Sequence, residues 1–487
     1  MISDSNASLT DIERLRDGID AAWEEARKFG LDPFPTHFEL VPASIMYEFA
    51  SYSLPGRFSH WTHGKAFYRQ KMQYDLGLSK IYEMVVNTNP SYAFLMEMND
   101  LLQNTFVAAH VFGHTDFFKN NAYFQHTSRR MIDKASIHAE RIAKYEFDHG
   151  KDVVEHFLDS VLSIQEHVDY NLLLHDNDPR KDDDKDEKRG KSGGEYSDLW
   201  GLDEKLQKAE EEREAQPGRT PKFPEKPEKD LLLFLLRHAP HLEPWQRDVI
   251  EIVRTEMLYF VPQMQTKTMN EGWASIWHSR IMRELGDRGT ISDSETIEFA
   301  QLHSGVLTPS RTSLNPYYIG YKVFEDIERR WDNPTEEEMA RLGRKPGMGR
   351  QKIFEVRELD NDVSFLRNYL TEDLVKDLDL YLYKKEGDEW VIAEKNWQKV
   401  RDTIVANMTN FGYPYLVVEN GDYRGNRELY LKHMFEGQEL DLNYAEKTMQ
   451  HVYHMWGRPV HLETLFEGKR ILLTFDGERN SKSTLEK

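Results

Sequence analysis

The chain has 487 residues, of which 39% are hydrophobic and 12% aromatic, which is enough apolar material for the packed interiors of two or three domains. Its 63 basic and 84 acidic side chains give a formal charge of −21, which disfavours a broad nucleic-acid surface because phosphate binding depends on clustered Lys and Arg. The sequence has no cysteine, no apolar run as long as the roughly 18 residues of a membrane span and no apolar leader after Met1, so we expect a cytoplasmic protein without disulfides or thiolate metal ligands.

Helical periodicity dominates the first two thirds of the chain. Apolar residues recur at helical spacing over residues 8–29, which predicts an amphipathic helix. Asn89-Pro90 has the form of an N-cap followed by a first-turn proline, and predicts a helix that runs to about Phe118. Further helices are predicted over residues 128–148, 152–170, 231–238, 244–260, 270–284, 292–302 and 318–331.

Two histidines, His110 and His114, lie four residues apart on one of these predicted helices. Residues with this spacing lie one above the other on a helix, so both imidazoles can reach one metal ion. Such pairs also occur by chance in a chain with 19 histidines. A later carboxylate completes sites of two histidines and one glutamate, and Glu271 suits that role. His278 follows on nearly the same helical face, as a fourth ligand or a proton donor.

A change of composition interrupts the helical region. From about residue 176 to residue 229, charged runs at 181–188 and 210–214 alternate with glycines and prolines. Such a segment cannot bury a core, so we predict a flexible charged insert that contributes little to the fold. The two parts of the metal motif lie on opposite sides of it. The predicted N-terminal domain therefore spans residues 1–342, and the insert interrupts this domain without dividing it.

The pattern changes again after a glycine-rich junction at residues 343–349. Strand-like runs at 380–383 and 390–393 flank Glu386-Gly387-Asp388, which predicts a hairpin. Further strand-like runs at 415–418, 428–431 and 470–475 alternate with helical patterns at 396–410 and 443–456. Residues 350–487 are therefore predicted to form a small α+β domain with an antiparallel sheet. The expected fold is a mainly α-helical N-terminal domain that carries the metal-site helices, followed by this C-terminal α+β domain.

The metal motif is similar to that of the gluzincin metallopeptidases, most closely the aminopeptidase branch. Residues 270–274, with the sequence Asn-Glu-Gly-Trp-Ala, resemble the third-ligand motif of that branch. The resemblance implies zinc, or another divalent ion, held by His110, His114 and Glu271. The chain departs from the HExxH pattern at Val111, where the glutamate that acts as general base would stand. Because valine cannot accept a proton, either another carboxylate is the base, the reaction is not peptide hydrolysis, or the site only binds.

Five segments, spread over much of the chain, share a second resemblance. They are residues 54–61 (Leu-Pro-Gly-Arg-Phe-Ser-His-Trp), 87–95 (Asn-Thr-Asn-Pro-Ser-Tyr-Ala-Phe-Leu), 110–121, 266–274 and 314–317 (Leu-Asn-Pro-Tyr). These segments look like the SpoVR family, which is named for a role in forming the spore cortex, the peptidoglycan layer of bacterial endospores. The family also occurs in bacteria that do not sporulate, commonly beside genes for a PrkA-type serine kinase and a YhbH/YeaH-type protein. The resemblance implies these two proteins as partners in a stress response.

Three clusters are candidates for the base that Val111 removes. They are Glu140 with His138, Glu256 with Tyr259, and His60 with His63. Each also has an ordinary structural interpretation, which is an ion pair with a nearby Arg or Lys, exposure to water, or packing around a tryptophan.

The sequence therefore supports two functions. In the first, the protein is a metal-dependent hydrolase in which His110, His114 and Glu271 hold a divalent ion. The family resemblance implies a peptidoglycan precursor, or a protein of its assembly pathway, as the substrate class. In the second, the protein is a non-catalytic metal-binding partner of the kinase system, which the loss of the base at Val111 favours.

Overall fold

The computed structural model describes residues 9–76, 83–173, 223–309, 313–387 and 389–485. The chain forms two compact units, each built from two stretches of sequence. The first unit comprises residues 1–151 and 258–413, and the second comprises residues 152–257 and 414–487. This division differs from the boundary expected near residues 343–349, because helices beyond that junction bury Ile353, Phe365 and Ile404 in the same core as the metal-motif helices.

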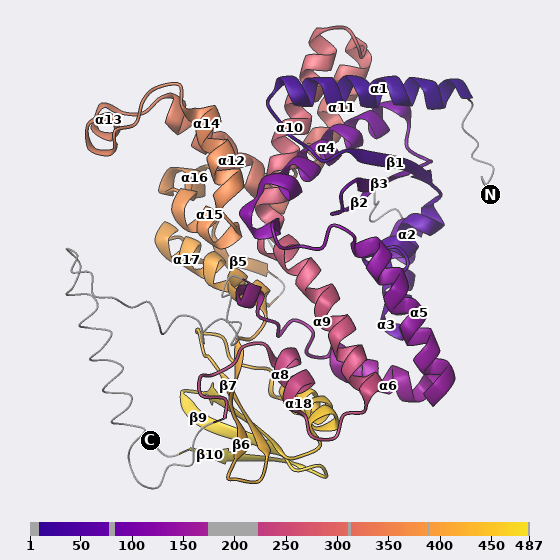
Figure 1. Cartoon of the computed structure of the whole chain (residues 1–487). Helices are drawn as coiled ribbons and strands as arrows, with labels where there is room; N and C mark the ends of the chain where they lie inside the picture. The colour runs from indigo at the N-terminus through magenta and orange to yellow at the C-terminus, as the bar shows by residue number, and fades with distance from the viewer. Residues whose placement is uncertain (1–8, 77–82, 174–222, 310–312, 388, 486–487) are drawn as a thin grey trace, which may run out of the picture. The chain divides into compact units, whose positions relative to one another are not determined.

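Two helices form the centre of the first unit (Figure 1). α4 (Leu101–Asn120) and α10 (Lys267–Asp287) are buried over most of their length and on most sides, as expected for helices inside a core. α1 (Leu9–Lys28) and α12 (Pro316–Asp332) pack against them. The other α-helices described in this unit are α2 (Ala43–Tyr52), α3 (Trp61–Asp75), α5 (Met131–His149), α11 (Asp293–Val306), α13 (Glu336–Leu342), α14 (Gly349–Leu359), α15 (Asp362–Tyr369), α16 (Glu372–Asp377) and α17 (Trp397–Met408).

Small residues allow α10 to approach its two neighbours closely. A Cβ atom on Gly113 of α4 would lie 2.6 Å from the Cα of Ala274 on α10. On another side of α10, a Cβ atom on Gly272 would lie 2.3 Å from the carbonyl carbon of Gly320 in α12. Both separations are far below ordinary van der Waals contact. These glycines therefore set the spacing of the helices that carry the metal motif.

A three-stranded sheet precedes α4, where the sequence predicted the start of a helix. β3 (Ser91–Met96) lies between β1 (Thr36–Val41), to which it is parallel, and β2 (Glu83–Val86), to which it is antiparallel. α4 begins only at Leu101, and the Asp100 carboxylate caps it by accepting a hydrogen bond from a first-turn amide. The prediction that Asn89-Pro90 begins this helix is wrong, because a short apolar run fits a buried strand as well as a helix.

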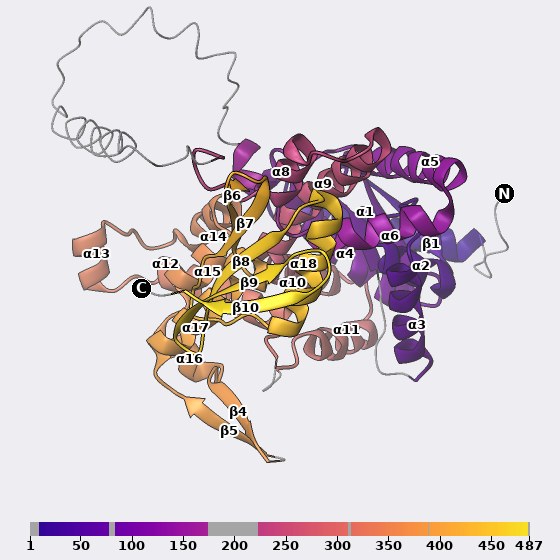
Figure 2. The ribbon, with the colours of Figure 1, turned by 90° about the horizontal axis from the view of Figure 1, so that it is seen from below.

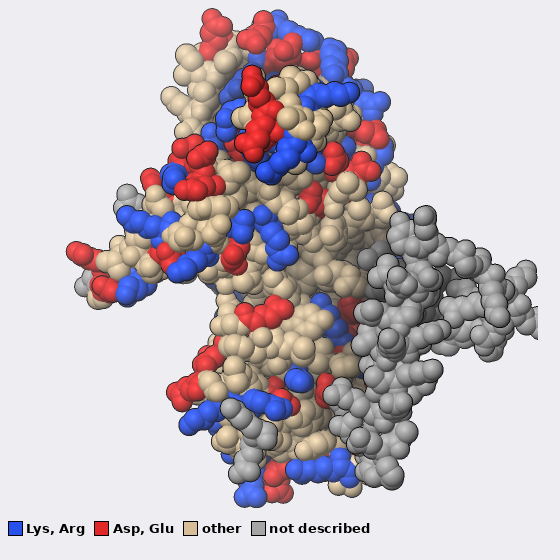
Figure 3. All heavy atoms as spheres, turned by 90° about the vertical axis from the view of Figure 1, so that its left-hand side faces the viewer, with Lys and Arg blue, Asp and Glu red and all other residues tan. Residues whose placement is uncertain are grey.

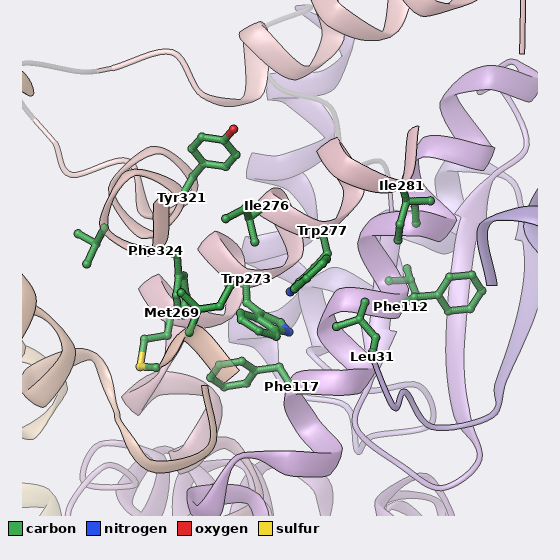
Figure 4. Packing of buried hydrophobic residues seen from close by; sticks show 14 of the residues in the cluster. Leu31, Phe112, Phe117, Met269, Trp273, Ile276, Trp277, Ile281, Tyr321 and Phe324 are labelled. Atoms are coloured by element: carbon green, nitrogen blue, oxygen red, sulfur yellow. The ribbon is translucent and has the colours of Figure 1, made fainter. Parts of the chain in front are cut away.

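Aromatic rings fill the space around α10 (Figure 4). Trp273 and Trp277 lie one turn apart on this helix, fully buried, with ring centroids 5.3 Å apart. Trp273 also packs edge-on against Phe324 of α12 at 5.3 Å, and Figure 4 shows Phe117 of α4 close to it. Burial of each such side chain contributes about 1.5–3 kcal/mol. This cluster therefore holds α4, α10 and α12 together.

A buried ion pair also joins three helices of the first unit. Oδ2 of Asp116 on α4 lies 3.1 Å from Nη1 of Arg357 on α14, and it accepts a hydrogen bond from Nε1 of Trp273 on α10 at 2.8 Å. Oδ1 accepts a further hydrogen bond from the amide of Asp32 at 2.7 Å. Burial raises the pKa of Asp116, whereas Arg357 opposes that rise.

The first unit ends in α15, α16 and α17 and the hairpin of β4 (Leu382–Glu386) and β5 (Glu389–Glu394). Figure 2 shows this hairpin extending beyond α16 and α17. The hairpin and α17 agree with the prediction from the sequence. The prediction that they belong to the C-terminal domain differs from the observed division, because α17 buries Val400 and Ile404 in the core of the first unit.

The second unit contains a five-stranded sheet with strand order β10-β9-β8-β7-β6 (Figure 2). Neighbouring strands are antiparallel, except that β7 and β8 are parallel. The sheet confirms the predicted fold class, a mainly helical N-terminal part followed by a C-terminal α+β part with an antiparallel sheet. Its strands are β6 (Leu416–Tyr423), β7 (Glu428–His433), β8 (Val460–Phe466), β9 (Lys469–Phe475) and β10 (Asn480–Thr484). The α-helices described in this part are α6 (Lys151–Leu162), α8 (Leu231–His238) and α18 (Leu442–Trp456), and α9 (Pro244–Gln265) continues from this unit into the first.

Two strands of this sheet were not predicted. The first four residues of β8, Val-His-Leu-Glu, alternate apolar and polar side chains, so a short strand signal is present in the sequence. β10 is an edge strand composed of polar residues, which carry no hydrophobic periodicity.

Most of the predicted charged insert, residues 176–222, lies outside the described residues. Its last part, residues 223–229, is packed within the second unit. The ring of Phe223 lies 5.7 Å from that of Phe234 on α8, and the backbone of Glu228 exchanges hydrogen bonds with Val418 of β6. The predicted insert therefore ends before Phe223, because this aromatic residue and the backbone after it have partners in the fold.

None of the described helices has the length and apolar character needed to cross a membrane. Figure 3 shows Lys and Arg interspersed with Asp and Glu over the described residues of the face in view. On this face, the negative excess is therefore not gathered into a single acidic field.

Candidate metal centre

Two histidines of α4 and one carboxylate of α10 converge in the first unit. His110 and His114 lie one turn apart, with nearly perpendicular rings whose centroids are 4.5 Å apart. Nε2 of each ring lies 3.5 Å from Oε2 of Glu271. Asp362 holds the first turn of α10 by accepting hydrogen bonds from two of its backbone amides, at 2.8 and 2.9 Å. The structure thus brings together the three residues that the sequence motif implied as ligands.

The spacing of these atoms suits a metal ion. Zinc–nitrogen and zinc–oxygen bonds are about 2.1 Å long, so two ligand atoms at a tetrahedral angle lie about 3.4 Å apart. The two observed separations of 3.5 Å are close to that value. Nε2 of His110 and Oε2 of Glu271 are buried and have no hydrogen-bond partner among the described residues. An unpaired buried polar atom costs about 1–3 kcal/mol, and a cation between these two atoms would satisfy both.

The charge state of Glu271 also fits this role. Burial opposes its ionisation, but His110, His114 and the nearby Lys267 outweigh burial and hold the pKa of Glu271 below its usual value. The carboxylate is therefore ionised at neutral pH, as metal binding requires.

Asn270, the residue before Glu271, fixes the orientation of His114. Oδ1 of Asn270 lies 3.0 Å from Nδ1 of His114. Because an amide oxygen only accepts hydrogen bonds, Nδ1 carries the hydrogen and Nε2 keeps the lone pair that faces Glu271. Burial, and then the neighbouring His110, lower the pKa of His114, so the ring is neutral. Asn270 is part of the sequence motif, but its role of orienting His114 was not predicted.

A second carboxylate reaches the site from β2. Ligand atoms of Glu83, His110 and His114 all lie within 4.8 Å of one another. Desolvation raises the pKa of Glu83 to about 7, an effect that His114 opposes and Glu271 reinforces. Glu83 was not predicted from the sequence, because no spacing connects this short strand with the helical motif. Its only local signal is a carboxylate at the start of an apolar strand.

His278 has a different position from the one expected. Its Nδ1 lies 2.8 Å from Nδ1 of His110, and its Nε2 lies 2.8 Å from Nδ1 of His303 on α11. Both ring nitrogens are therefore engaged with other histidines, and neither is available to bind an ion. The structure places His278 behind His110, as a residue that orients it, in contrast to the predicted fourth ligand or proton donor. Seven residues on a helix return to the same face, but that rule does not say which neighbour the side chain meets.

A pocket of about 490 Å³ opens onto the site. Glu83, His110 and Tyr317 contribute to its polar lining, and Phe106 and Leu314 to its apolar lining. The ring of Tyr317 stacks beside that of His110, with centroids 6.0 Å apart and an interplanar angle of 25°. Burial, and then the charges of Glu271 and Glu83, raise the pKa of Tyr317. Its hydroxyl therefore keeps its proton and can donate it in a hydrogen bond within the pocket.

The structure places the other base candidates elsewhere. Glu140 is exposed on α5, and Tyr259 is buried with its hydroxyl accepting a hydrogen bond from a backbone amide at 3.1 Å. Neither is among the described residues that line the pocket. Glu256 is buried in the second unit. His60 caps α3, and its ring centroid lies 6.1 Å from that of His63.

Comparison with known proteins points to one family. A family model described as SpoVR like protein matches residues 9–413, and one described as SpoVR-like C-terminal domain matches residues 414–467. The Escherichia coli (strain K12) protein named "Uncharacterized protein YcgB" is 30% identical over 488 residues, which cover 93% of this chain and 94% of that protein. No solved structure matches the chain. The border between the two family models, after residue 413, is also where the chain passes from the first unit into the second.

Proposed function

This chain belongs to the SpoVR family, and we propose that it is a metal-dependent hydrolase whose ion is held by His110, His114 and Glu271. The observation that carries the proposal is the convergence of both Nε2 atoms on Oε2 of Glu271 at 3.5 Å. Two of these three atoms are buried, yet no described residue is their hydrogen-bond partner.

The ligand set suits zinc first among the divalent ions. Two imidazoles and one carboxylate are the ligands of catalytic zinc sites that keep one position open. When bound, such an ion would polarise a substrate carbonyl and acidify a water molecule. Asn270 holds His114 in the tautomer that such a site needs, with the lone pair on Nε2.

Glu83 is the residue that we propose as general base, in place of the glutamate that the HExxH pattern has at the position of Val111. Val111 is fully buried and has no ionisable group. Glu83 lies beside both histidines. Its pKa of about 7 suits a carboxylate that takes up a proton at neutral pH and returns it to a leaving group.

Tyr317 supplies a donor on the same pocket wall. Because its phenol stays protonated, it can donate a hydrogen bond to an oxygen atom that gains negative charge during hydrolysis. Phe106 and Leu314 give the pocket an apolar side, against which an apolar part of a substrate could pack.

The substrate class rests on the family resemblance alone. The association of the SpoVR family with the spore cortex supports a peptidoglycan precursor, or a protein of its assembly pathway, as the substrate. We place this activity in the cytoplasm, in sporulation or in a stress response.

A second candidate function is favoured by Val111. If the residue at the usual base position marks a site that has lost catalysis, the protein is a metal-binding partner of a PrkA-type serine kinase and a YhbH/YeaH-type protein. The metal would then have a structural or sensing role. In the first candidate function the protein hydrolyses a substrate and needs Glu83 to do so. In the second it hydrolyses no substrate.

One set of variants tests both candidates. We expect the purified protein to contain about one divalent ion per chain, measured by elemental analysis, and we expect His110→Ala and Glu271→Ala to lose it. Glu83→Gln should keep the ion but lose hydrolysis of muropeptides, peptidoglycan precursors or peptide libraries. His37→Ala, at an exposed position on β1, is the matched control and should change neither quantity.

Full metal content in both ligand variants would reject the site. A different result would reject the hydrolase and support the kinase-linked function. In that case the ligand variants lose the metal as expected, but the unaltered protein and His114→Ala show the same background level of hydrolysis. Turnover that survives in Glu83→Gln would move the role of base to another residue.

A further inference from the structure

Three histidines form a continuous hydrogen-bonded chain that begins at the candidate metal centre. Nδ1 of His110 lies 2.8 Å from Nδ1 of His278, and Nε2 of His278 lies 2.8 Å from Nδ1 of His303. The chain runs from α4 through α10 to α11. We call it the histidine chain. It connects His110, whose Nε2 faces Glu271, with His303, which is partly exposed.

Aromatic packing encloses the histidine chain. His278 is fully buried, and Phe106 packs edge-on against it with ring centroids 4.5 Å apart. Phe299 stacks beside His303, with ring centroids 5.7 Å apart and an interplanar angle of 24°. A charged ring at the buried middle position would be costly in such surroundings. His278 is therefore neutral, and the chain is considered with one hydrogen on each ring.

Neutrality limits the histidine chain to two arrangements. Each hydrogen bond needs one nitrogen that carries a hydrogen and one that does not, and a neutral imidazole has one of each. His278 uses both of its nitrogens. Once the tautomer of one ring is set, the tautomers of the other two follow. The two arrangements differ in the direction in which all the hydrogen bonds point.

A metal ion on Nε2 of His110 selects one direction. That nitrogen must offer its lone pair, so the hydrogen of His110 lies on Nδ1 and is donated to Nδ1 of His278. His278 then carries its hydrogen on Nε2 and donates it to Nδ1 of His303. His303 carries its own hydrogen on Nε2.

The position of Glu271 favours the other direction in the metal-free protein. Nε2 of His110 lies 3.5 Å from the carboxylate oxygen, too far for a short hydrogen bond, but the negative charge of the carboxylate favours a hydrogen on the nitrogen that faces it. Nδ1 of His110 is then an acceptor for Nδ1–H of His278. Nε2 of His278 is in turn an acceptor for Nδ1–H of His303.

We propose that metal binding reverses the direction of the histidine chain, so that the hydrogen of His303 moves from Nδ1 to Nε2. Each ring loses one N–H bond and forms one, so every ring keeps one hydrogen and the net charge of the three rings is unchanged. His303 is thereby a positioning residue for the ion, acting through His278 and His110. The inference rests on the metal site of the proposed function.

The test observes the tautomers directly. The full chain, labelled with ¹⁵N in histidine, is compared after EDTA treatment and after addition of one equivalent of zinc, by long-range ¹H–¹⁵N correlation spectra. We expect His303 to change from the Nδ1–H form to the Nε2–H form, and His278 likewise. An identical tautomer of His303 in both samples, with zinc bound, overturns the inference. Failure to bind zinc would instead reject the metal site itself, and the inference with it.

Substitution of His303 gives an independent readout. His303→Phe removes the acceptor for His278 while keeping an aromatic ring, and should raise the Kd for zinc roughly 10- to 100-fold. His303→Gln keeps an acceptor oxygen and a donor amide, and should restore most of the affinity. His37→Phe, at an exposed histidine of β1, is the control and should leave the Kd unchanged. An unchanged Kd in His303→Phe overturns the positioning role.

Discussion

Asp116 illustrates, at the scale of single residues, how this protein holds a buried charge. Its carboxylate is fully buried on α4. Three other segments supply its partners, which are the Arg357 guanidinium, the Trp273 indole and the Asp32 amide. A buried carboxylate is tolerated only when its partners replace water. Because α4 and α10 also carry the candidate metal centre, this network supports the geometry of the site.

We expect Arg357→Met to lower the free energy of unfolding by about 3–5 kcal/mol, because the substitution leaves the Asp116 carboxylate buried without its cation. Urea denaturation followed by circular dichroism measures the change. Arg130→Met is the matched control, since the Arg130 side chain is 81% exposed in its ion pair with Asp133, and it should cost less than about 0.5 kcal/mol. Equal effects of the two substitutions would contradict the role of the buried pair.

At the scale of elements, the position of α10 depends on two close helix–helix contacts that only glycine permits. One is with α4 at Gly113 and the other is with α12 at Gly320. A sequence can show that Gly272 follows Glu271, but the reason for glycine there is the backbone of a helix that lies far away along the chain. The close approach keeps Glu271 within 3.5 Å of both histidines.

Gly272→Ala should therefore lower the free energy of unfolding by about 3 kcal/mol, because its Cβ atom would overlap the backbone of Gly320 and force the helices apart. Metal content should fall together with stability. In α3, a Cβ atom on Gly64 would have no described residue within 4 Å, so Gly64→Ala should raise stability by about 0.5–1 kcal/mol. Thermal unfolding of both variants measures the difference, and a Gly272→Ala protein as stable as the original would refute the close-contact argument.

At the scale of the whole molecule, each of the two units contains a buried histidine that resists protonation. Burial, and then the charges of Arg57 and His60, lower the pKa of His63 in the first unit to about 4. Burial, and then Lys229, lower the pKa of His167 in the second unit to about 4. Acid should therefore act on both units.

Stability should fall as the pH falls from about 6.5 to about 4. In the unfolded chain these histidines take up protons below about pH 6.5, whereas in the folded protein they do so only below about pH 4. Between these values the unfolded state binds more protons, so the free energy of unfolding decreases with decreasing pH. The effect is at most about 3.4 kcal/mol for each histidine.

Urea denaturation at several pH values measures this dependence. His63→Gln and His167→Gln should each flatten it, because glutamine does not titrate, whereas His126→Gln at an exposed position should not. A dependence that stays equally steep in both buried-site variants would show that other groups control the acid sensitivity.

The sequence by itself determined those features whose signals are local. Helical periodicity placed most of the helices, and the change to strand-like runs indicated the fold class, because both patterns arise within a few consecutive turns or residues. The spacing of His110 and His114 is equally local, since one helical turn places both rings on one face. The similarity of residues 270–274 to a known motif led us to expect Glu271 as a third ligand beside them.

Only the tertiary structure decided which groups meet across the chain. Glu83 joins the site because β2 pairs with β3 in front of α4, and no sequence spacing encodes that pairing. His278 lies behind His110 and contacts His303 because α10 packs between α4 and α11. The sequence indicated a domain boundary near residue 343, whereas the first unit ends after residue 413. This difference has the same cause. A side chain's own helix sets its direction, but its partners are set by the packing of segments far apart in sequence, through contacts that leave no periodic signal.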